Sequence, residues 1–166
     1  PHWALMRSVA RRICDRKMLK LIKLWLKAPV EECDEQGQCR LSGGKGSSRG
    51  TPQGGVVSPL LANIYMHRYL RYWQQERKSE QFRAKVINYA DDFVILSRGH
   101  ASEALAWTRD VMIRLKLRLN ETKTCIRDAR REPFDFLGYT FGMAGYRKTG
   151  GRYYAAQPSA TSVRRL

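Results

Sequence analysis

The stretch that decides the fold is Val86-Ile87-Asn88-Tyr89-Ala90-Asp91-Asp92-Phe93-Val94-Ile95-Leu96. Two runs rich in β-branched and aromatic residues flank two adjacent carboxylates, and such runs favour strands. Asn, Ala and Asp suit a tight turn, so the stretch predicts a β-hairpin with Asp91 and Asp92 at its tip. Because neighbouring side chains of a strand point to opposite faces, consecutive aspartates converge on one site only at or beside a turn. Taken alone, the pair also fits an ordinary solvated turn.

Helical patterns lie on both sides of this hairpin. Apolar residues recur with helical spacing from Trp3 to Ala28 in two pieces, the second capped by Asp15. A second helix is predicted from Ser58, as its N-cap with Pro59 in the first turn, to about Trp73. A third runs from about Ser102 to Leu115.

The first helical segment is strongly basic. In its second piece, Leu21, Leu24 and Trp25 form an apolar stripe that we expect to face the core. The other faces of the segment carry eight cations, most of which we expect to be solvated: Arg7, Arg11, Arg12, Arg16, Lys17, Lys20, Lys23 and Lys27.

The remaining segments predict loops and strands. Val30 to Gly50 is polar and Gly-rich but lacks the spacing of a phosphate-binding loop, so it is interpreted as a flexible connection. Leu117 to Ile126 alternates apolar and polar residues, which predicts a turn and a strand. Phe134 to Phe141 is aromatic and β-prone, with Gly138 as a bulge or close-approach point, and Arg152 to Tyr154 is a strand candidate. Helices packed on one face of a small antiparallel sheet make the predicted class α+β.

Composition and charge narrow the possible partners. Among 166 residues, 31 Lys and Arg outnumber 15 Asp and Glu, which gives a net charge of +16. This excess predicts a polyanionic partner, nucleic acid first and an anionic membrane surface second. No apolar run in these 166 residues approaches the roughly 18 residues of a membrane span, and we find no signal-peptide pattern among them.

The cysteines fit neither a zinc site nor a dense disulfide framework. They stand at positions 14, 33, 39 and 125. Cys33 and Cys39 lie in a polar loop and could be bridged, but we expect a reduced, cytoplasmic setting. The spacing of the three histidines predicts no ligand role.

Four blocks, taken in order, resemble the motifs of reverse transcriptases encoded by group II introns. Gly50-Thr51-Pro52-Gln53-Gly54, with Ser58 to Asn63, is similar to the motif that contacts template and incoming nucleotide. Tyr89-Ala90-Asp91-Asp92 is similar to the catalytic hairpin. Leu119-Asn120 with Lys123-Thr124 resembles the next motif, and Phe136-Leu137-Gly138-Tyr139 resembles the primer grip.

The resemblance implies a domain arrangement. Residues 1–139 would form part of a polymerase palm, and residues 140–166 the connection to the thumb and its start. The motif with the first metal-binding aspartate, and the fingers, would precede Pro1, so we expect this chain alone to be inactive. One departure is Lys116, where the family usually has Gly.

The resemblance also implies site residues. Asp91 would be the main ligand, and Asp92 a weaker ligand, of two Mg²⁺ ions that carry out nucleotidyl transfer. Lys123 would act as a general acid toward pyrophosphate; without the family it would be an ordinary surface lysine. Residues lining the nascent base pair would be Pro52, Gln53, Gly54 and Ala90. The primer end would be supported by Phe136, Leu137 and Gly138, of which Phe136 is also expected to pack in the core.

The function implied is RNA-directed DNA polymerisation of the group II intron type. Its partners would be an RNA template, a DNA primer, dNTP and intron RNA, with no membrane. Because an exposed sheet edge pairs readily, homodimers through that edge are a further expectation. Two alternatives remain open: a nucleic-acid-binding module without catalysis, and a reverse transcriptase of the retron, diversity-generating or CRISPR-linked type. A non-enzymatic scaffold with a chance Asp-Asp turn is the weakest alternative.

Overall fold

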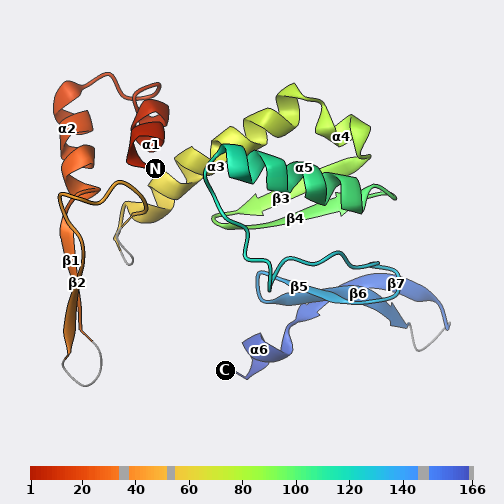
Figure 1. Ribbon diagram of the computed structural model, residues 1–166. Helices are drawn as coiled ribbons and strands as arrows, with labels where there is room; N and C mark the ends of the chain where they lie inside the picture. The colour runs from red at the N-terminus through yellow and green to blue at the C-terminus, as the bar shows by residue number, and fades with distance from the viewer. Residues whose placement is uncertain (34–37, 52–54, 146–149, 165–166) are drawn as a thin grey trace. The chain divides into compact units, whose positions relative to one another are not determined.

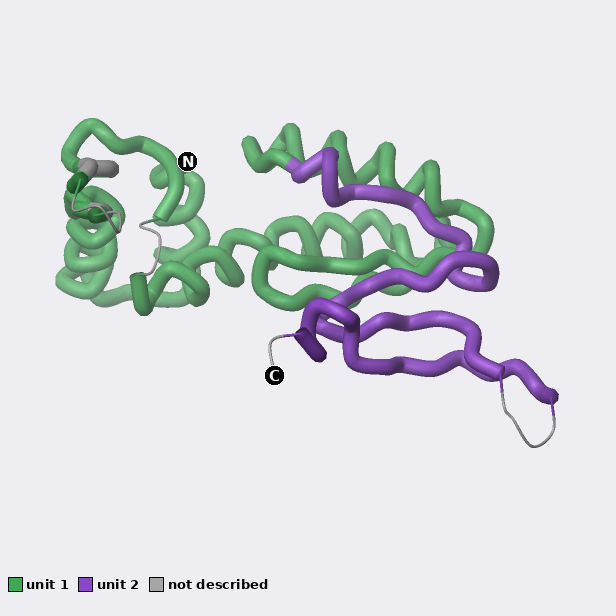
Figure 2. Tube along the Cα trace, turned by 90° about the horizontal axis from the view of Figure 1, so that it is seen from below, with its two compact units in different colours: residues 1–118 green, residues 119–166 purple. Residues whose placement is uncertain are grey.

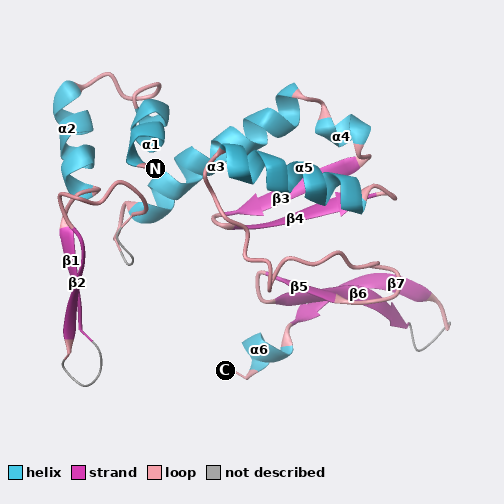
Figure 3. Ribbon diagram, in the orientation of Figure 1, coloured by secondary structure: helices cyan, strands magenta, loops and turns pink. Residues whose placement is uncertain are grey.

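The computed structural model describes residues 1–33, 38–51, 55–145 and 150–164. The chain divides into two compact units, Pro1–Arg118 and Leu119–Leu166 (Figure 2). Both combine helices with antiparallel strands (Figure 3), in agreement with the predicted α+β class. The predicted palm boundary after residue 139 is a functional division and stays a prediction. No described helix has the length and apolar character needed to cross a membrane.

The first unit contains five helices and two β-hairpins within the described residues. They are α1 (His2–Val9), α2 (Arg16–Trp25), β1 (Pro29–Cys33), β2 (Cys39–Gly43), α3 (Ser58–Gln75), α4 (Lys78–Gln81), β3 (Ala84–Tyr89), β4 (Asp92–Ser97) and α5 (Ala101–Arg114). Asp15 caps α2 as predicted, because its carboxylate accepts a hydrogen bond from the Lys17 backbone N–H at 2.7 Å. The N-cap of α3 is Val57, so the predicted cap at Ser58 is wrong by one residue.

The core of this unit forms where α3 and α5 cover one face of the β3–β4 hairpin (Figure 1). Tyr69 of α3 is fully buried, and its ring lies 5.4 Å from Phe93 of β4 and 5.8 Å from Trp107 of α5. Trp73 and Phe82 extend the cluster. Offset aromatic contacts of this kind add stability beyond the area they bury. The covered face of the hairpin is therefore fixed, and α3 and α5 leave the opposite face of the same two strands uncovered.

The apolar stripe predicted for α2 is wrong. Ile22 and Leu26 are the buried residues, whereas Leu21, Leu24 and Trp25 are exposed. The apolar side chains of α2 span a wider arc of the helix than the part that packs against the rest of the unit. The periodic pattern identified the helix correctly but not its buried side.

The stretch predicted as a flexible connection forms the β1–β2 hairpin. Its register places Cys33 directly opposite Cys39, and a disulfide joins them. The expectation that these cysteines stay reduced is therefore wrong. Directly paired residues of an antiparallel ladder lie close enough for a disulfide, and the polar sequence concealed this pairing.

The second unit is a three-stranded antiparallel sheet followed by a short helix. Its elements are β5 (Phe134–Phe136), β6 (Tyr139–Gly145), β7 (Arg152–Pro158) and α6 (Ala160–Val163), with strand order β5-β6-β7. The Phe134 and Phe141 rings stack at 5.4 Å, and the Tyr154 hydroxyl donates to the Ala129 carbonyl. The strand candidate from Arg152 to Tyr154 is thus confirmed as part of β7.

Of the turn and the strand predicted between Leu117 and Ile126, the turn forms and the strand does not. The backbone carbonyl of Asn120 accepts hydrogen bonds from the N–H groups of Lys123 and Thr124, and its side chain accepts from Thr122. Asn readily stabilises such a turn with its own side chain, and here this preference overrides the alternating pattern.

Candidate functional site

The tip of the β3–β4 hairpin confirms the predicted turn. Tyr89 pairs with Asp92, which leaves Ala90 and Asp91 as the two turn residues. Ala90 has φ 51°, a left-handed conformation that costs a residue with a Cβ roughly 1 kcal/mol. The Asn88 side-chain amide donates to the Ala90 carbonyl at 3.2 Å and supports this conformation. The strand partners and this hydrogen bond together hold Asp91 at the apex.

Both aspartates are exposed, as expected for a site that receives substrate. Asp92 lies on the same face of the hairpin as its strand partner Tyr89, and 63% of Tyr89 is exposed. This is the face that α3 and α5 leave uncovered. The two carboxylates therefore offer oxygen ligands beside an open, partly aromatic surface.

Carboxylate oxygens are the hard donors that Mg²⁺ prefers. Asp91 and Asp92 fit such an ion in type and in exposure. Across the described ranges, no third His, Cys, Asp or Glu joins them in a cluster with metal-ligand spacing. The hairpin accordingly supplies two carboxylates of a potential site, and substrate phosphates are the usual further ligands of Mg²⁺.

The predicted nucleotide-contacting residues Pro52, Gln53 and Gly54 lie outside the described residues. The segment that precedes these residues is anchored by α1. The His2 ring Nε2 donates to the Gly50 carbonyl at 2.7 Å, and the His2 backbone N–H donates to the Ser48 carbonyl at 2.8 Å. This role of His2 was not predicted from the sequence, because no local pattern signals a contact across 48 positions.

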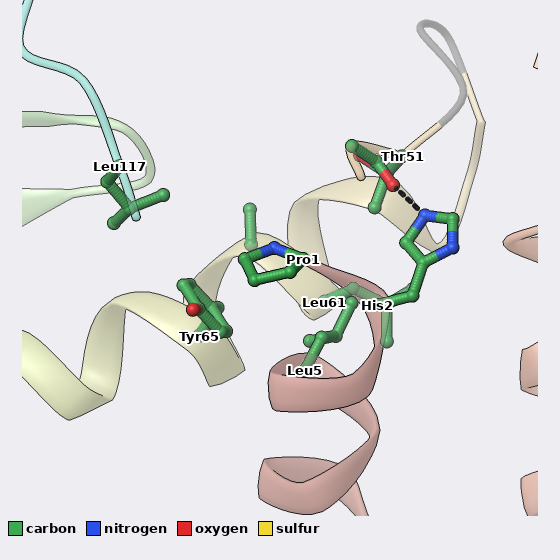
Figure 4. A pocket seen from close by; sticks show the side chains of 9 residues that line it. Pro1, His2, Leu5, Thr51, Leu61, Tyr65 and Leu117 are labelled. Carbon is green, nitrogen blue, oxygen red and sulfur yellow. Dashed lines mark hydrogen bonds between the residues drawn. The ribbon is translucent and has the colours of Figure 1, made fainter. Parts of the chain in front are cut away.

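A cavity of about 180 Å³ lies beside this segment (Figure 4). Its lining is mostly apolar and comprises Pro1, His2, Leu5, Gly50, Thr51, Leu61, Ala62, Tyr65 and Leu117. The Tyr65 hydroxyl already has a hydrogen-bond partner within the chain, since it donates to the Leu115 carbonyl at 2.7 Å. Small-molecule sites typically have volumes of roughly 300–1,000 Å³, so we assign no ligand to this cavity.

The turn between β5 and β6 contains the residues predicted to support a primer. Phe136 pairs with Tyr139, and the turn residues Leu137 and Gly138 have φ 52° and 80°. A two-residue hairpin turn with both φ values positive normally carries Asn-Gly or Asp-Gly. Leu137 instead places an apolar side chain in a strained conformation, and 46% of it is exposed. Backbone strain of this kind is common at functional sites.

Two features favour Gly138 at this turn. Its φ is positive, and a Cβ at this position would lie 2.8 Å from the Ser162 Oγ. The Gly138 carbonyl accepts hydrogen bonds from the Ser159 N–H at 2.8 Å and the Ser162 hydroxyl at 2.9 Å. The close approach predicted for Gly138 is confirmed, although the residue belongs to a turn and not to a bulge.

Lys123 is exposed and lies outside the sheet of the second unit. Its backbone N–H donates to the Asn120 carbonyl at 3.0 Å. The structure thus brings together Ala90, Asp91 and Asp92 in the first unit. In the second unit it brings together Phe136, Leu137 and Gly138, with Lys123 in neither group.

Comparisons with known proteins agree with these motifs. The family model described as reverse transcriptase (RNA-dependent DNA polymerase) matches residues 1–141. The chain is 33% identical to protein YkfC of Escherichia coli K12, over 83% of this chain and 42% of that protein.

Intron-encoded proteins also match. The group II intron-encoded protein LtrA of Lactococcus lactis is 26% identical over 83% of this chain and 32% of LtrA. An uncharacterized 91 kDa protein in the cob intron of Schizosaccharomyces pombe is 25% identical over 83% of this chain and 23% of that protein. The chain spans less than half the length of each relative. The resemblance to group II intron-encoded reverse transcriptases is thereby confirmed.

Proposed function

This chain belongs to the reverse transcriptase (RNA-dependent DNA polymerase) family, and we propose that it supplies the catalytic hairpin of a group II intron-type enzyme that copies RNA into DNA. The observation that carries the proposal is the exposed Asp91-Asp92 pair at the tip of a hairpin whose other face is fixed by α3 and α5. The similarity to LtrA supports intron RNA as a further partner.

In the proposed reaction, a primer hydroxyl attacks the α-phosphate of a dNTP in line, and pyrophosphate leaves. By resemblance to the family, Asp91 at the apex of the turn would be the main ligand of Mg²⁺, and Asp92, the first residue of β4, the weaker one. Bound Mg²⁺ would supply charge stabilisation for the attacking and leaving oxygens. Ala90, with its short side chain, leaves room for a nucleic acid strand at the tip.

Other residues of the proposed site act on the substrates. Pro52, Gln53 and Gly54 line the nascent base pair in this proposal. Lys123 donates a proton to the leaving pyrophosphate, and its exposure is compatible with that role. A general acid must come within hydrogen-bond reach of the oxygen that it protonates.

The primer-supporting role rests on the strained turn at Leu137. Leu137→Asn places the preferred residue at the first turn position, so we expect the second unit to gain about 0.5–1 kcal/mol of stability. We also expect primer extension to fall, because the variant cannot make the exposed apolar contact with the primer. Thermal denaturation is measured on this chain, and primer extension on the longer natural protein that contains it, each with the same substitution. Faster extension together with higher stability would argue against the primer contact.

The catalytic proposal is tested by primer extension with the longer natural protein that contains this chain. We expect Asp91→Asn to reduce extension more than about a hundredfold, because an ionised ligand at the reacting centre is removed. Asp110→Asn removes an exposed carboxylate from α5 and serves as the matched control. Equal activity of the two variants would refute the assignment of Asp91.

We further propose that the chain of residues 1–166 does not extend primers unaided, since its described residues bring only two carboxylates together at the hairpin. Extension by the purified chain would contradict this. The net charge of +16 favours one alternative, a nucleic-acid-binding module without catalysis. That alternative predicts unchanged extension by Asp91→Asn in the longer protein, together with retained RNA binding.

A further inference from the structure

One face of the β1–β2 hairpin carries two sulfur atoms and a carboxylate. Cys33 pairs directly with Cys39 in the antiparallel ladder, with 4.0 Å between their Cα atoms. Glu31 stands two positions before Cys33 on the same strand, so its side chain points to the same face. One carboxylate oxygen of Glu31 and the two Sγ atoms all lie within 4.8 Å of one another. The alternation of the strand and the register of the ladder thus bring three metal-binding groups together.

This cluster is open to solvent. Glu31, Cys33 and Cys39 are all exposed. The direct ladder partner of Glu31 is Leu41, which is 75% exposed, so no cation lies directly opposite the carboxylate. Across the residues that the structure describes, no other three His, Cys, Asp or Glu side chains form such a cluster. A cation from solution can therefore reach all three groups.

We propose that Glu31, Cys33 and Cys39 form a redox-controlled site for a thiophilic divalent cation of the Zn²⁺ type. In the oxidised chain, the disulfide occupies both sulfur atoms and closes the site. In the reduced chain, two thiolates and one carboxylate supply three ligands of a tetrahedral ion, and water supplies the fourth. Sulfur donors select zinc-type ions over Mg²⁺, which requires oxygen ligands. The site therefore uses no part of the Mg²⁺ chemistry proposed for Asp91 and Asp92.

The geometry of the hairpin suits such an ion. With Zn–S distances of about 2.3 Å and Zn–O distances of about 2.0–2.2 Å, the ligand atoms of a tetrahedral site lie roughly 3.5–4 Å apart. The three groups already lie within 4.8 Å, so rotations of the side chains suffice once the sulfur atoms are no longer bonded to each other. The sequence alone predicted no zinc site, because the two cysteines are six positions apart, whereas about two to four residues separate a typical zinc-binding pair. The antiparallel register takes the place of that short spacing.

Reduction of the pair and binding of the cation balance in electrons and protons. A dithiol reductant transfers two electrons and two protons to the Cys33–Cys39 disulfide; the S–S bond breaks, two thiols form, and the reductant becomes a disulfide. The cation then displaces both thiol protons into solvent, because thiolates and not thiols are the ligands. Oxidation of the pair and binding of the metal therefore exclude each other.

Cobalt spectroscopy of the full chain tests the site. Cys14→Ser/Cys125→Ser removes the two exposed cysteines outside the disulfide, so any thiolate signal then comes from the hairpin. After reduction with a phosphine, which offers the metal no thiol, we expect one Co²⁺ per chain to produce thiolate-to-metal charge-transfer bands. Zn²⁺ should abolish these bands, since it binds such donors more tightly than Co²⁺. Bands of equal strength in the oxidised chain, or no bands in the reduced chain, would overturn the proposal.

Two substitutions in the same background assign the ligands. We expect Cys39→Ser to abolish the bands and Glu31→Gln to weaken Co²⁺ binding at least about tenfold, because loss of a ligand costs no less than loss of a group that only orients one. Glu80→Gln removes an exposed carboxylate from α4 and is the matched control. Equal affinity of the Glu31→Gln and Glu80→Gln variants would refute Glu31 as a ligand. Binding of one Co²⁺ by two chains would likewise refute a site built within a single hairpin.

Amide hydrogen exchange of the reduced chain tests the site without cobalt. A cation that binds only the paired hairpin stabilises it by mass action, so Zn²⁺ at about ten times its dissociation constant should slow exchange in β1 and β2 roughly tenfold. Glu31→Gln should lose most of this protection at the same Zn²⁺ concentration, and Glu80→Gln should keep it. Protection spread equally over the hairpin and α3, or none in the hairpin, would overturn the proposal. Either result leaves the assignment of Asp91 untouched, because the two sites share no residue.

Discussion

At the scale of single residues, the ionisation of buried Tyr69 makes the stability of the first unit depend on pH. Burial raises the pKa of Tyr69 to about 12, against a weaker opposing effect of its hydrogen bond with Thr108. The unfolded chain ionises this phenol near pH 10, whereas the folded chain keeps its proton until about pH 12. Stability from Tyr69 is therefore complete below pH 10 and is lost as the pH rises toward 12.

We expect the free energy of unfolding to fall by on the order of 2 kcal/mol over this interval because of Tyr69. Denaturant titrations at successive pH values measure the fall. Tyr69→Phe should flatten the curve, and Tyr153→Phe, at a site 49% exposed, should leave it unchanged. A curve as steep in Tyr69→Phe as in the parent would contradict the assignment.

The backbone conformation of Lys116 leads to a second prediction at this scale. It has φ 57° and follows α5, where its N–H donates to the Ile113 carbonyl and the Leu117 N–H donates to the Met112 carbonyl. Gly is preferred at this position of a helix end, so we expect Lys116→Gly to raise stability by about 0.5–1 kcal/mol. The Lys116 ammonium lies 5.8 Å from the centroid of the Trp3 ring, and removal of this cation–π interaction offsets part of the gain.

Thermal denaturation measures this gain. Lys116→Ala is the control, since Ala keeps a Cβ in the left-handed region and should bring no gain. If both variants were equally stabilised, side-chain effects would explain the result and backbone strain would not.

At the scale of elements, the β1–β2 hairpin is held by its disulfide. A disulfide that closes a loop this short contributes roughly 2 kcal/mol by restricting the open chain. We expect thiol reduction, or Cys33→Ser with Cys39→Ser, to speed amide hydrogen exchange in β1 and β2 at least about tenfold. Exchange in α3 and β3 should not change, because opening of the hairpin is local. Equal acceleration of amide exchange in β1, β2, α3 and β3 would mean that the hairpin and the core open together.

Helices and strands were predictable from the sequence where a single local feature, such as a run of β-branched residues or a capping residue, determines the element. The β-branched runs around Asp91 and the cap at Asp15 specify their elements locally, and both predictions are confirmed. The β1–β2 hairpin is polar and was missed, because its pairing depends on cross-strand partners that no periodicity shows. The predicted buried side of α2 was wrong because an apolar stripe does not reveal which part of it finds a neighbour.

At the scale of the whole molecule, the order of motifs was predictable and the long-range contacts were not. The Asp91-Asp92 tip follows from local composition, whereas the Leu137-Gly138 turn interrupts a stretch that was predicted as strand with a bulge or close approach at Gly138. The contact of His2 with Gly50 joins segments that are distant in sequence, and only the folded chain reveals it. The strain at Leu137 is equally hidden, because Leu stands where such a turn normally has Asn or Asp and therefore continues the apolar pattern of a strand.

The β3–β4 hairpin leads to a prediction about association. Each of its strands pairs only with the other among the described residues, so both outer edges retain unpaired backbone groups. Its open face also exposes Ile87, at 40%, and Leu96, at 44%. Unpaired edges beside apolar side chains favour pairing with a second copy of the chain.

We therefore expect the mass measured by light scattering after size exclusion to rise with concentration from 19.2 kDa toward twice that value. Ile87→Lys should reduce the rise, because a charge on the open face opposes edge pairing. Ile113→Lys places the same charge on α5, away from the hairpin, and should not reduce it. A constant monomer mass at high concentration would show that the helices and the twist of the hairpin protect its edges sufficiently.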